Sequence, residues 1–304
     1  MKRTIISCLL MILFLVGCST AGSSEEAASL TYDTGADPDA WAPIPAGEFL
    51  YGLHEHETMV ESDYEAMVNT VTNAQFADYL NEALTTGSIE IVGDEIVGYY
   101  LGDEFHGGRH EEKITEGDYL HVPLSESGLR IESVDGSFMP LPGYENHPMV
   151  HLTWFGAKEY CEFNGWRLPT EVEWEKAARG TDSRAYPWGD DIGPENANYY
   201  SSHDVFEKTF GKAGDTTPVG LYNGGSYDGF ETVDSPSPYG LYDMAGNVWQ
   251  WTDDVYEGQH YRYMRGGSKA NYAYNLRIWT RNNATPEYNS PSVGFRCVRD
   301  PVGS

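Results

Sequence analysis

The segment that follows Gly266-Gly267-Ser268 carries side chains suited to holding a ligand at a protein surface. Between positions 269 and 292 it is rich in tyrosine, asparagine, serine and tryptophan. Tyrosine and tryptophan give large rigid contacts, whereas asparagine and serine give adaptable hydrogen bonds. We expect a binding surface formed by Lys269, Asn271, Tyr272, Tyr274, Trp279 and Asn282. The alternative is that these aromatic side chains pack internally, and this alternative is strongest for Trp279.

A second group of side chains with possible chemistry lies in the loop-rich stretch between Gly87 and Gly143. It contains His106, His110 and His121, together with acidic residues at positions 103, 104, 111 and 112. Such side chains form a metal site when their spacing is tight and regular. No His-x-His or His-x₃-His-x-Glu pattern occurs here, so we expect solvated loop histidines rather than a metal cluster.

Four motifs in a fixed order make the chain similar to a known family. They are RLPTEVEWEKAARG from Arg167, GLYDMAGNVWQW from Gly240, RGGS from Arg265 and GFRC from Gly294. The set resembles the formylglycine-generating enzyme (sulfatase-modifying factor) family over residues 41–300. The resemblance implies one α+β domain with a variant of the C-type-lectin-like fold: few short helices, short antiparallel strands and much ordered loop.

The resemblance also implies where the family's chemistry would lie. Its enzymes oxidise a sulfatase cysteine to formylglycine and bind copper through two cysteines, about a dozen residues or fewer after Gly-Gly-Ser. Here no cysteine lies between Ser268 and Cys297, and asparagine or tyrosine cannot replace thiolates that hold monovalent copper. We therefore expect no copper, no catalytic residue and no formylglycine generation. Trp249 and Ser268 match positions around the family's active-site cleft, which we expect to serve ligand binding.

Two groups of residues match the family's structural calcium sites. The first group is Asn198, Tyr199, Asp204 and Phe206, of which the two aromatic residues would contribute backbone carbonyls. The second group is Asp243, Gly246, Val248 and Gln250. Carboxylate, amide and carbonyl oxygens are the ligands that calcium needs. We expect calcium at the first site, whereas a glutamine in place of the family's glutamate leaves the second site open. The alternative is a pair of hydrogen-bonded turns without metal.

The first 18 residues are typical of an export signal. Lys2 and Arg3 precede an apolar run over residues 5–16 that is too short to span a membrane. Leu15-Val16-Gly17-Cys18 resembles a bacterial lipoprotein cleavage box, and cleavage would leave Cys18 as an acylated N-terminus in the cell envelope. The alternative is an ordinary secretory signal that is cut nearby. Residues 19–40 are small, polar and acidic, which predicts a flexible tether before the domain.

The charge balance limits the classes of partner. The chain has a formal net charge of −28, with 47 acidic residues against 19 lysines and arginines. Such a balance excludes nucleic acid as a partner, because binding its phosphates needs a basic surface. It fits a solvated exterior or carboxylates that hold cations.

Only Cys161 and Cys297 remain in the expected domain, because Cys8 is discarded with the signal and Cys18 carries lipid. An exported protein meets oxidising conditions, so we expect the two to pair. The family resemblance agrees, since these positions are bridged in family members. The alternative is two buried free thiols.

Local signals predict the elements that must position these residues. Capping boxes at Thr72–Gln75 and Thr170–Glu173 predict helices over residues 73–84 and up to Gly180. A further helix is expected over residues 154–163, and the turn signals Gly93-Asp94 and Asp135-Gly136 predict hairpins. We expect an opening strand over residues 43–49. The residues expected in the core are Trp249, Trp251, Phe295 and Val298.

Three functions fit these observations. The first is a ligand-binding module on a lipid anchor, whose segment after Ser268 is similar in composition to the variable segments of retroelement-diversified proteins. The second is a non-standard oxidoreductase of the same superfamily, and the third is a structural component of a surface assembly. We favour the first, with the membrane and an unidentified protein or small molecule as partners.

Overall fold

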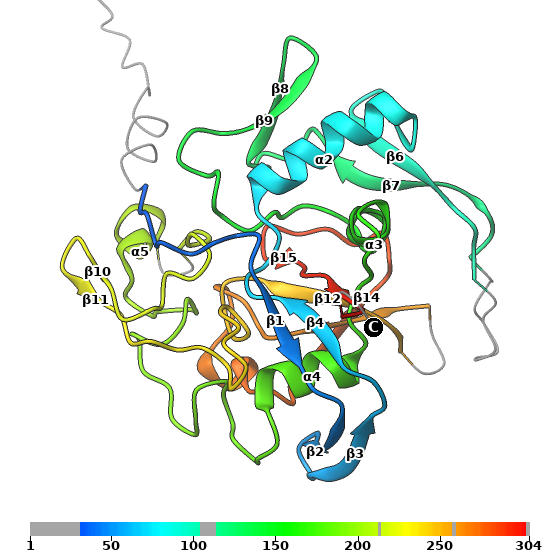
Figure 1. Cartoon of the computed structure of the whole chain (residues 1–304). Helices are drawn as coiled ribbons and strands as arrows, with labels where there is room; N and C mark the ends of the chain where they lie inside the picture. The colour runs from blue at the N-terminus through cyan, green and yellow to red at the C-terminus, as the bar shows by residue number, and fades with distance from the viewer. Residues whose placement is uncertain (1–30, 104–113, 212–213, 257–259, 302–304) are drawn as a thin grey trace, which may run out of the picture.

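The computed structural model describes residues 31–103, 114–211, 214–256 and 260–301 (Figure 1). It is an α+β fold in which short helices and small sheets are joined by long ordered loops, as expected. The helices are α2 (Asn73–Thr86), α3 (Trp154–Phe163), α4 (Glu171–Arg179) and α5 (Val205–Phe210), followed by the 3₁₀ turn η1 (Ala273–Leu276).

Two sheets hold the domain together. One joins the two ends of the domain in the order β1-β4-β16, formed by β1 (Trp41–Ile44), β4 (Tyr64–Met67) and β16 (Val298–Arg299). The other has the order β14-β13-β12-β15 and consists of β12 (Trp249–Val255), β13 (Arg262–Arg265), β14 (Arg281–Ala284) and β15 (Val293–Gly294). Its β12–β15 pair is parallel and its other pairs are antiparallel. This second sheet carries the motifs on either side of Gly266-Gly267-Ser268.

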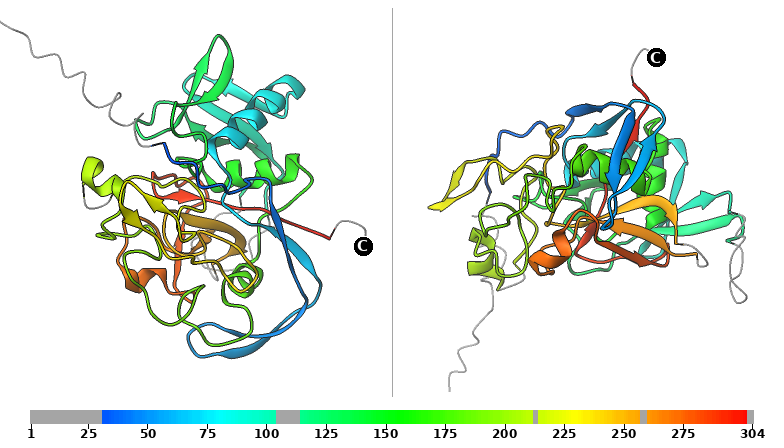
Figure 2. Two further views of the ribbon diagram at one scale, coloured as in Figure 1. Left: turned by 60° about the vertical axis from the view of Figure 1, so that its left-hand side comes forward. Right: turned by 90° about the horizontal axis from the view of Figure 1, so that it is seen from below.

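Hairpins and a three-stranded sheet project from this centre (Figures 1 and 2). They are β2–β3 (Gly47–Tyr51, His56–Val60), β5-β6-β7 (Ile89–Val92, Glu95–Tyr100, Gly117–Pro123), β8–β9 (Ile131–Val134, Ser137–Pro140) and β10–β11 (Ser226–Tyr227, Phe230–Glu231). Both predicted hairpin turns are confirmed. The opening strand over residues 43–49 is wrong as one element, because Pro45 and Ala46 separate β1 from β2.

The predicted helix starts are confirmed in detail. Thr72 and Thr170 each close a reciprocal capping box, with Gln75 and Glu173 respectively. Helix α2 runs on to Thr86, further than predicted, and ends where Gly87 adopts a left-handed conformation with φ 77°. The caps supply hydrogen-bond partners for backbone groups that the first helical turn leaves unpaired.

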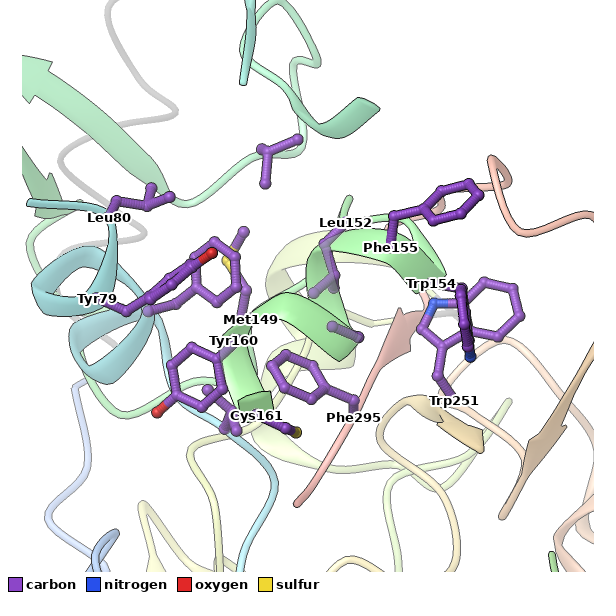
Figure 3. Close-up of a cluster of buried hydrophobic side chains, with 14 of the residues drawn as sticks. Tyr79, Leu80, Met149, Leu152, Trp154, Phe155, Tyr160, Cys161, Trp251 and Phe295 are labelled. Atoms are coloured by element: carbon purple, nitrogen blue, oxygen red, sulfur yellow. The ribbon is translucent and has the colours of Figure 1, made fainter. Parts of the chain in front are cut away.

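The main core lies between helices α2 and α3 and the strand β15 region (Figure 3). Its aromatic rings pack closely: Phe76 stacks on Tyr160 with centroids 5.6 Å apart, and Tyr160 meets Phe295 edge-on at 5.3 Å. The predicted disulfide is present in the same cluster, where Cys161 and Cys297 have Cα atoms 5.7 Å apart. Trp249, Trp251, Phe295 and Val298 are all buried, as the sequence predicts.

Part of the predicted tether packs on the domain. Tyr32 contacts the rings of Phe206 and Tyr227, with centroids 6.0 and 5.5 Å away. The Thr34 hydroxyl donates to the Val219 carbonyl at 2.9 Å. The packed chain therefore begins earlier than the predicted boundary at residue 41. The signal sequence and Cys18 lie outside the described residues. No helix in the described part of the chain is long and apolar enough to cross a membrane.

Candidate ligand-binding surface

The loop after β13 is anchored by a tight turn at Gly266-Gly267-Ser268. Gly267 has φ +72°, and an added Cβ would lie 2.8 Å from Leu276 Cδ1, so this position requires glycine. The buried Ser268 donates from Oγ to Asn271 Oδ1 at 2.7 Å, and its N–H donates to the same oxygen at 3.1 Å. These contacts fix the path of the chain that follows.

Two tyrosines stand on this anchored base. Tyr272 is 66% exposed and Tyr274 is 64% exposed, which are unusually high values for such large side chains. The Tyr272 ring meets Tyr200 edge-on with centroids 5.0 Å apart, and the Tyr200 N–H donates to the Asn271 carbonyl at 2.8 Å. The two tyrosines thus present rigid aromatic area to solvent without being part of the core.

Cations flank the aromatic side chains. The Arg277 guanidinium lies 4.8 Å from the Tyr274 ring centroid and 5.8 Å from that of Trp279. Arg179 of helix α4 lies 5.5 Å from the Trp279 ring. Trp279 is half-buried, so it is neither fully internal nor fully available for contact. The geometry favours recognition through π-faces and a guanidinium.

The predicted surface residues do not all reach the surface together. Ser268, Lys269 and Trp249 are buried, and Trp249 belongs to the main core cluster. Burial lowers the pKa of Lys269, and the charge of Asp215 opposes that shift. Asn282 is exposed, but it lies on β14 opposite Met264. The structure therefore brings together Asn271, Tyr272, Tyr274 and Trp279, and places the others beneath or beside them.

A buried charge network that the sequence did not suggest supports this surface from below. Glu175 of α4 is fully buried and accepts from Arg179 at 2.8 Å and from Arg265 of β13. Arg265 and Arg281 each lie 3.4 Å from Glu171 Oε1. Burial raises the pKa of Glu171, and the two arginines oppose the shift. The sequence feature that could have predicted this network is the spacing of residues 171, 175 and 179, which puts them on one face of helix α4.

Two residues of the first predicted calcium group, Asp204 and Phe206, lie at the start of α5, whereas Asn198 Nδ2 donates to the Asp215 carbonyl at 2.9 Å. Asp204 Oδ1 accepts from the N–H groups of Phe206 and Glu207, and Oδ2 accepts from Ser202 Oγ at 2.9 Å. Burial raises the pKa of Asp204, and no ion pair to it is formed by the described cations. An unpaired buried carboxylate fits a cation site. A calcium ion would compete with the helix N–H groups for this carboxylate, and calcium here stays a prediction.

At the second group, protein donors and acceptors already surround the side chain of Gln250. Its Oε1 accepts from Trp174 Nε1 at 2.9 Å and from Arg296 Nε at 2.7 Å, and its Nε2 donates to the Asp243 carbonyl at 2.7 Å. Burial raises the pKa of Asp243 to about 6, and the Arg296 charge opposes the rise. The buried guanidinium of Arg296 already supplies a positive charge to Asp243. This arrangement favours a hydrogen-bonded turn without metal over a calcium site. Gly246 and Val248 lie buried in the same turn.

The histidines of the loop-rich stretch form no site in the described part of the chain. The expectation of solvated loop histidines is wrong for His121, which is buried on β7, whereas His106 and His110 lie outside the described residues. No group of three or more histidine, cysteine, aspartate or glutamate side chains that could hold a metal occurs among the residues described.

The chain is similar to one protein family and to several proteins of known structure. The family described as "Sulfatase-modifying factor enzyme 1-like domain" matches residues 28–301. A formylglycine-generating enzyme of Thermomonospora curvata is 34% identical over 301 residues, covering 85% of this chain and 93% of the relative. The inactive C-alpha-formylglycine-generating enzyme 2 of Mus musculus is 30% identical over 281 residues, covering 86% of each. The structure of PvdO from Pseudomonas aeruginosa superposes with TM-score 0.57 at 19% identity, covering 89% of this chain and 98% of PvdO, which shows a common fold.

Proposed function

This chain belongs to the sulfatase-modifying factor enzyme 1-like family, and we propose that within it the chain binds a ligand and does not generate formylglycine. One observation carries the proposal: the loop after Ser268 displays two exposed tyrosines where the family resemblance implies copper-binding cysteines. Both cysteines of the described residues are joined in the Cys161–Cys297 disulfide, so neither offers a free thiolate to copper. An inactive relative of 30% identity supports the idea that the scaffold can persist without the chemistry.

The ligand should be recognised by aromatic contact and a cation together. Tyr272 and Tyr274 give large contact areas at low entropic cost, and Arg277 offers a planar donor set beside them. The turn at Gly267 and the Ser268–Asn271 hydrogen bonds hold these side chains in place before binding. Such pre-organisation reduces the ordering that binding requires.

The binding test compares two double variants on arrays of immobilised glycans and peptides. Replacing both Tyr272 and Tyr274 by alanine should weaken binding to the best array ligands by roughly tenfold or more, because exposed aromatic anchors carry binding energy. Unfolding temperature should hardly change, since neither ring lies in the core. The matched control replaces the exposed Tyr256 and Tyr288 by alanine and should bind like the wild type. Equal loss in both double variants would contradict the proposal.

The enzymatic alternative has its own assay. Purified protein is incubated with copper and a sulfatase-type Cys-x-Pro-x-Arg peptide, and aldehyde formation is measured. We expect no more aldehyde than a heat-denatured control gives. Aldehyde above that background would show that the chain is a non-standard oxidoreductase of its family and would overturn the non-catalytic part of the proposal.

We also propose that the protein is lipid-anchored in the cell envelope through Cys18, with calcium as a structural ion at the first site. The lipobox-like Leu15-Val16-Gly17-Cys18 supports the anchor, and the unpaired Asp204 carboxylate supports the ion. In the Cys18→Ser variant we expect an uncleaved or mislocalised precursor. Fractionation and migration identical to the wild type would exclude the anchor.

A further inference from the structure

A cavity of about 430 Å³ lies between helix α3 and the strands β6 and β7. It shares no lining residue with the surface around Tyr272, so it is a separate feature of the domain. Its volume falls within the range of small-molecule pockets. Its walls come from the end of β6, the middle of β7 and one side of α3, which packs against both strands.

Aromatic rings form one side of this cavity. Tyr100 meets Phe155 edge-on at 5.2 Å between centroids, and Phe155 in turn stacks on Tyr119 at 4.3 Å. Tyr99 is also among the lining residues, but it alternates with Tyr100 along β6, so its ring lies on the opposite face of the strand and its hydroxyl donates to Glu116 Oε2 at 3.2 Å. The faces of such rings carry negative electrostatic potential and attract cations.

The charged lining of the cavity leaves one carboxylate unmatched. Lys158 Nζ lies 2.7 Å from Glu162 Oε1 and 3.6 Å from Asp253 Oδ1, so this ammonium is already neutralised. No cation among the described residues forms an ion pair with Glu159, which also lines the cavity. Burial raises the pKa of Glu159, and the neighbouring Glu162 charge raises it further. Among the described lining residues, Glu159 is therefore a carboxylate without an ion-pair partner.

The floor of the cavity is a buried neutral histidine. His121 is 2% exposed, and its Nδ1 has no hydrogen-bond partner among the residues that the structure describes. Its ring packs beneath Gly98 of β6, where an added Cβ would lie 2.3 Å from the ring Cε1, which explains a glycine in the middle of a strand. Burial lowers the pKa of His121 to about 4, so near pH 7 the ring is uncharged and does not repel a cation.

We infer that this cavity binds a small organic amine, whose ammonium group pairs with Glu159 beside the ring of Tyr100. Lys158 cannot supply that charge, because Glu162 and Asp253 hold it. The acidic chain as a whole attracts cations toward the site. The apolar part of the ligand packs against Phe155. This inference is independent of the function proposed above.

The test is calorimetric titration of the full chain with 2-phenylethylamine and with 2-phenylethanol at pH 7. The two probes share their ring and chain, and only the amine carries a charge. We expect the amine to bind and the alcohol to bind at least about tenfold more weakly, as expected for losing a hydrogen bond to a charged group. Absence of amine binding, or equal binding of both probes, would overturn the inference.

Variants locate the binding in the cavity. Glu159→Gln keeps the shape of the side chain and should weaken amine binding by about tenfold. Glu90→Gln, an exposed change on β5 outside the cavity lining, should leave it unchanged. Wild-type affinity in Glu159→Gln would place the binding elsewhere and refute the site.

Discussion

Replacing Glu175 by glutamine should destabilise the domain more than any other single change of one carboxylate to an amide in helix α4. Glu175 is fully buried, and its two oxygens accept from Arg179, from Arg265 and from the Gly52 N–H at 2.5 Å. The substitution keeps the volume of the side chain. It removes the negative charge that faces two arginines, which are themselves fully buried.

The expected cost follows from the charges that are left behind. After the change, Arg265 keeps one carboxylate within 4 Å among the described residues, that of Glu171 at 3.4 Å. Arg179 keeps no ion-pair partner among the described residues. Removing one partner of a buried ion pair typically costs about 3–5 kcal/mol, because it strands an uncompensated charge. A domain's total free energy of unfolding is typically about 5–15 kcal/mol. The variant should therefore lose a large part of its stability.

Urea unfolding followed by tryptophan fluorescence measures this loss, with the slope against urea checked for constancy. The matched control is Glu173→Gln in the same helix. Glu173 pairs with the partly exposed Arg167 at 2.6 Å, and a glutamine at this position preserves the capping box with Thr170. Partly exposed pairs contribute little, so we expect a loss of about 1 kcal/mol or less.

A result within about 1 kcal/mol of the wild type for Glu175→Gln would refute the reasoning, because it would show that the two arginines do not need this charge. A double-mutant cycle sharpens the test. Glu175→Gln combined with Arg265→Gln should cost clearly less than the two single changes added together, since the second change removes a stranded cation. Strict additivity would mean that the pair is not coupled.

The remaining predictions concern the disulfide, acid stability and calcium. Reducing the Cys161–Cys297 bond should lower the free energy of unfolding by about 5 kcal/mol in the chain-entropy model, because the bond closes a separation of 136 residues; a reduced protein with an unchanged urea midpoint would contradict this. The pKa of His121 falls from 6.5 unfolded to about 4 folded, so the unfolded state alone gains a proton as the pH falls below 6.5. Stability should therefore drop between pH 7 and pH 5, and His121→Gln should reduce that drop by an amount on the order of 2 kcal/mol; identical pH profiles would exclude the effect. Excess chelator should lower the unfolding temperature if calcium binds at Asn198 and Asp204, since a ligand of the native state stabilises it; an unchanged value, with no calcium by elemental analysis, would rule the site out.

The sequence alone determined the features that depend on contacts a few residues apart. The capping boxes at Thr72 and Thr170 and the turn at Asp135-Gly136 are closed by hydrogen bonds or dihedral preferences within two to four positions, as the motif spacing implies. The disulfide was also predictable, because the expected domain contains only two cysteines. The family resemblance could be read from the order of the motifs, and the absence of cysteines between Ser268 and Cys297 from the sequence itself.

Tertiary structure decided which of the predicted surface residues reach solvent and what supports them. Lys269 and Tyr272 are three positions apart, yet one is buried and the other is exposed, because the Ser268–Asn271 turn directs them differently. Glu175 and Arg265 meet across 90 positions, and the cavity beside Glu159 lies between β6 and α3. No local pattern encodes such pairings, since they exist only after distant segments pack and exclude water from the groups between them.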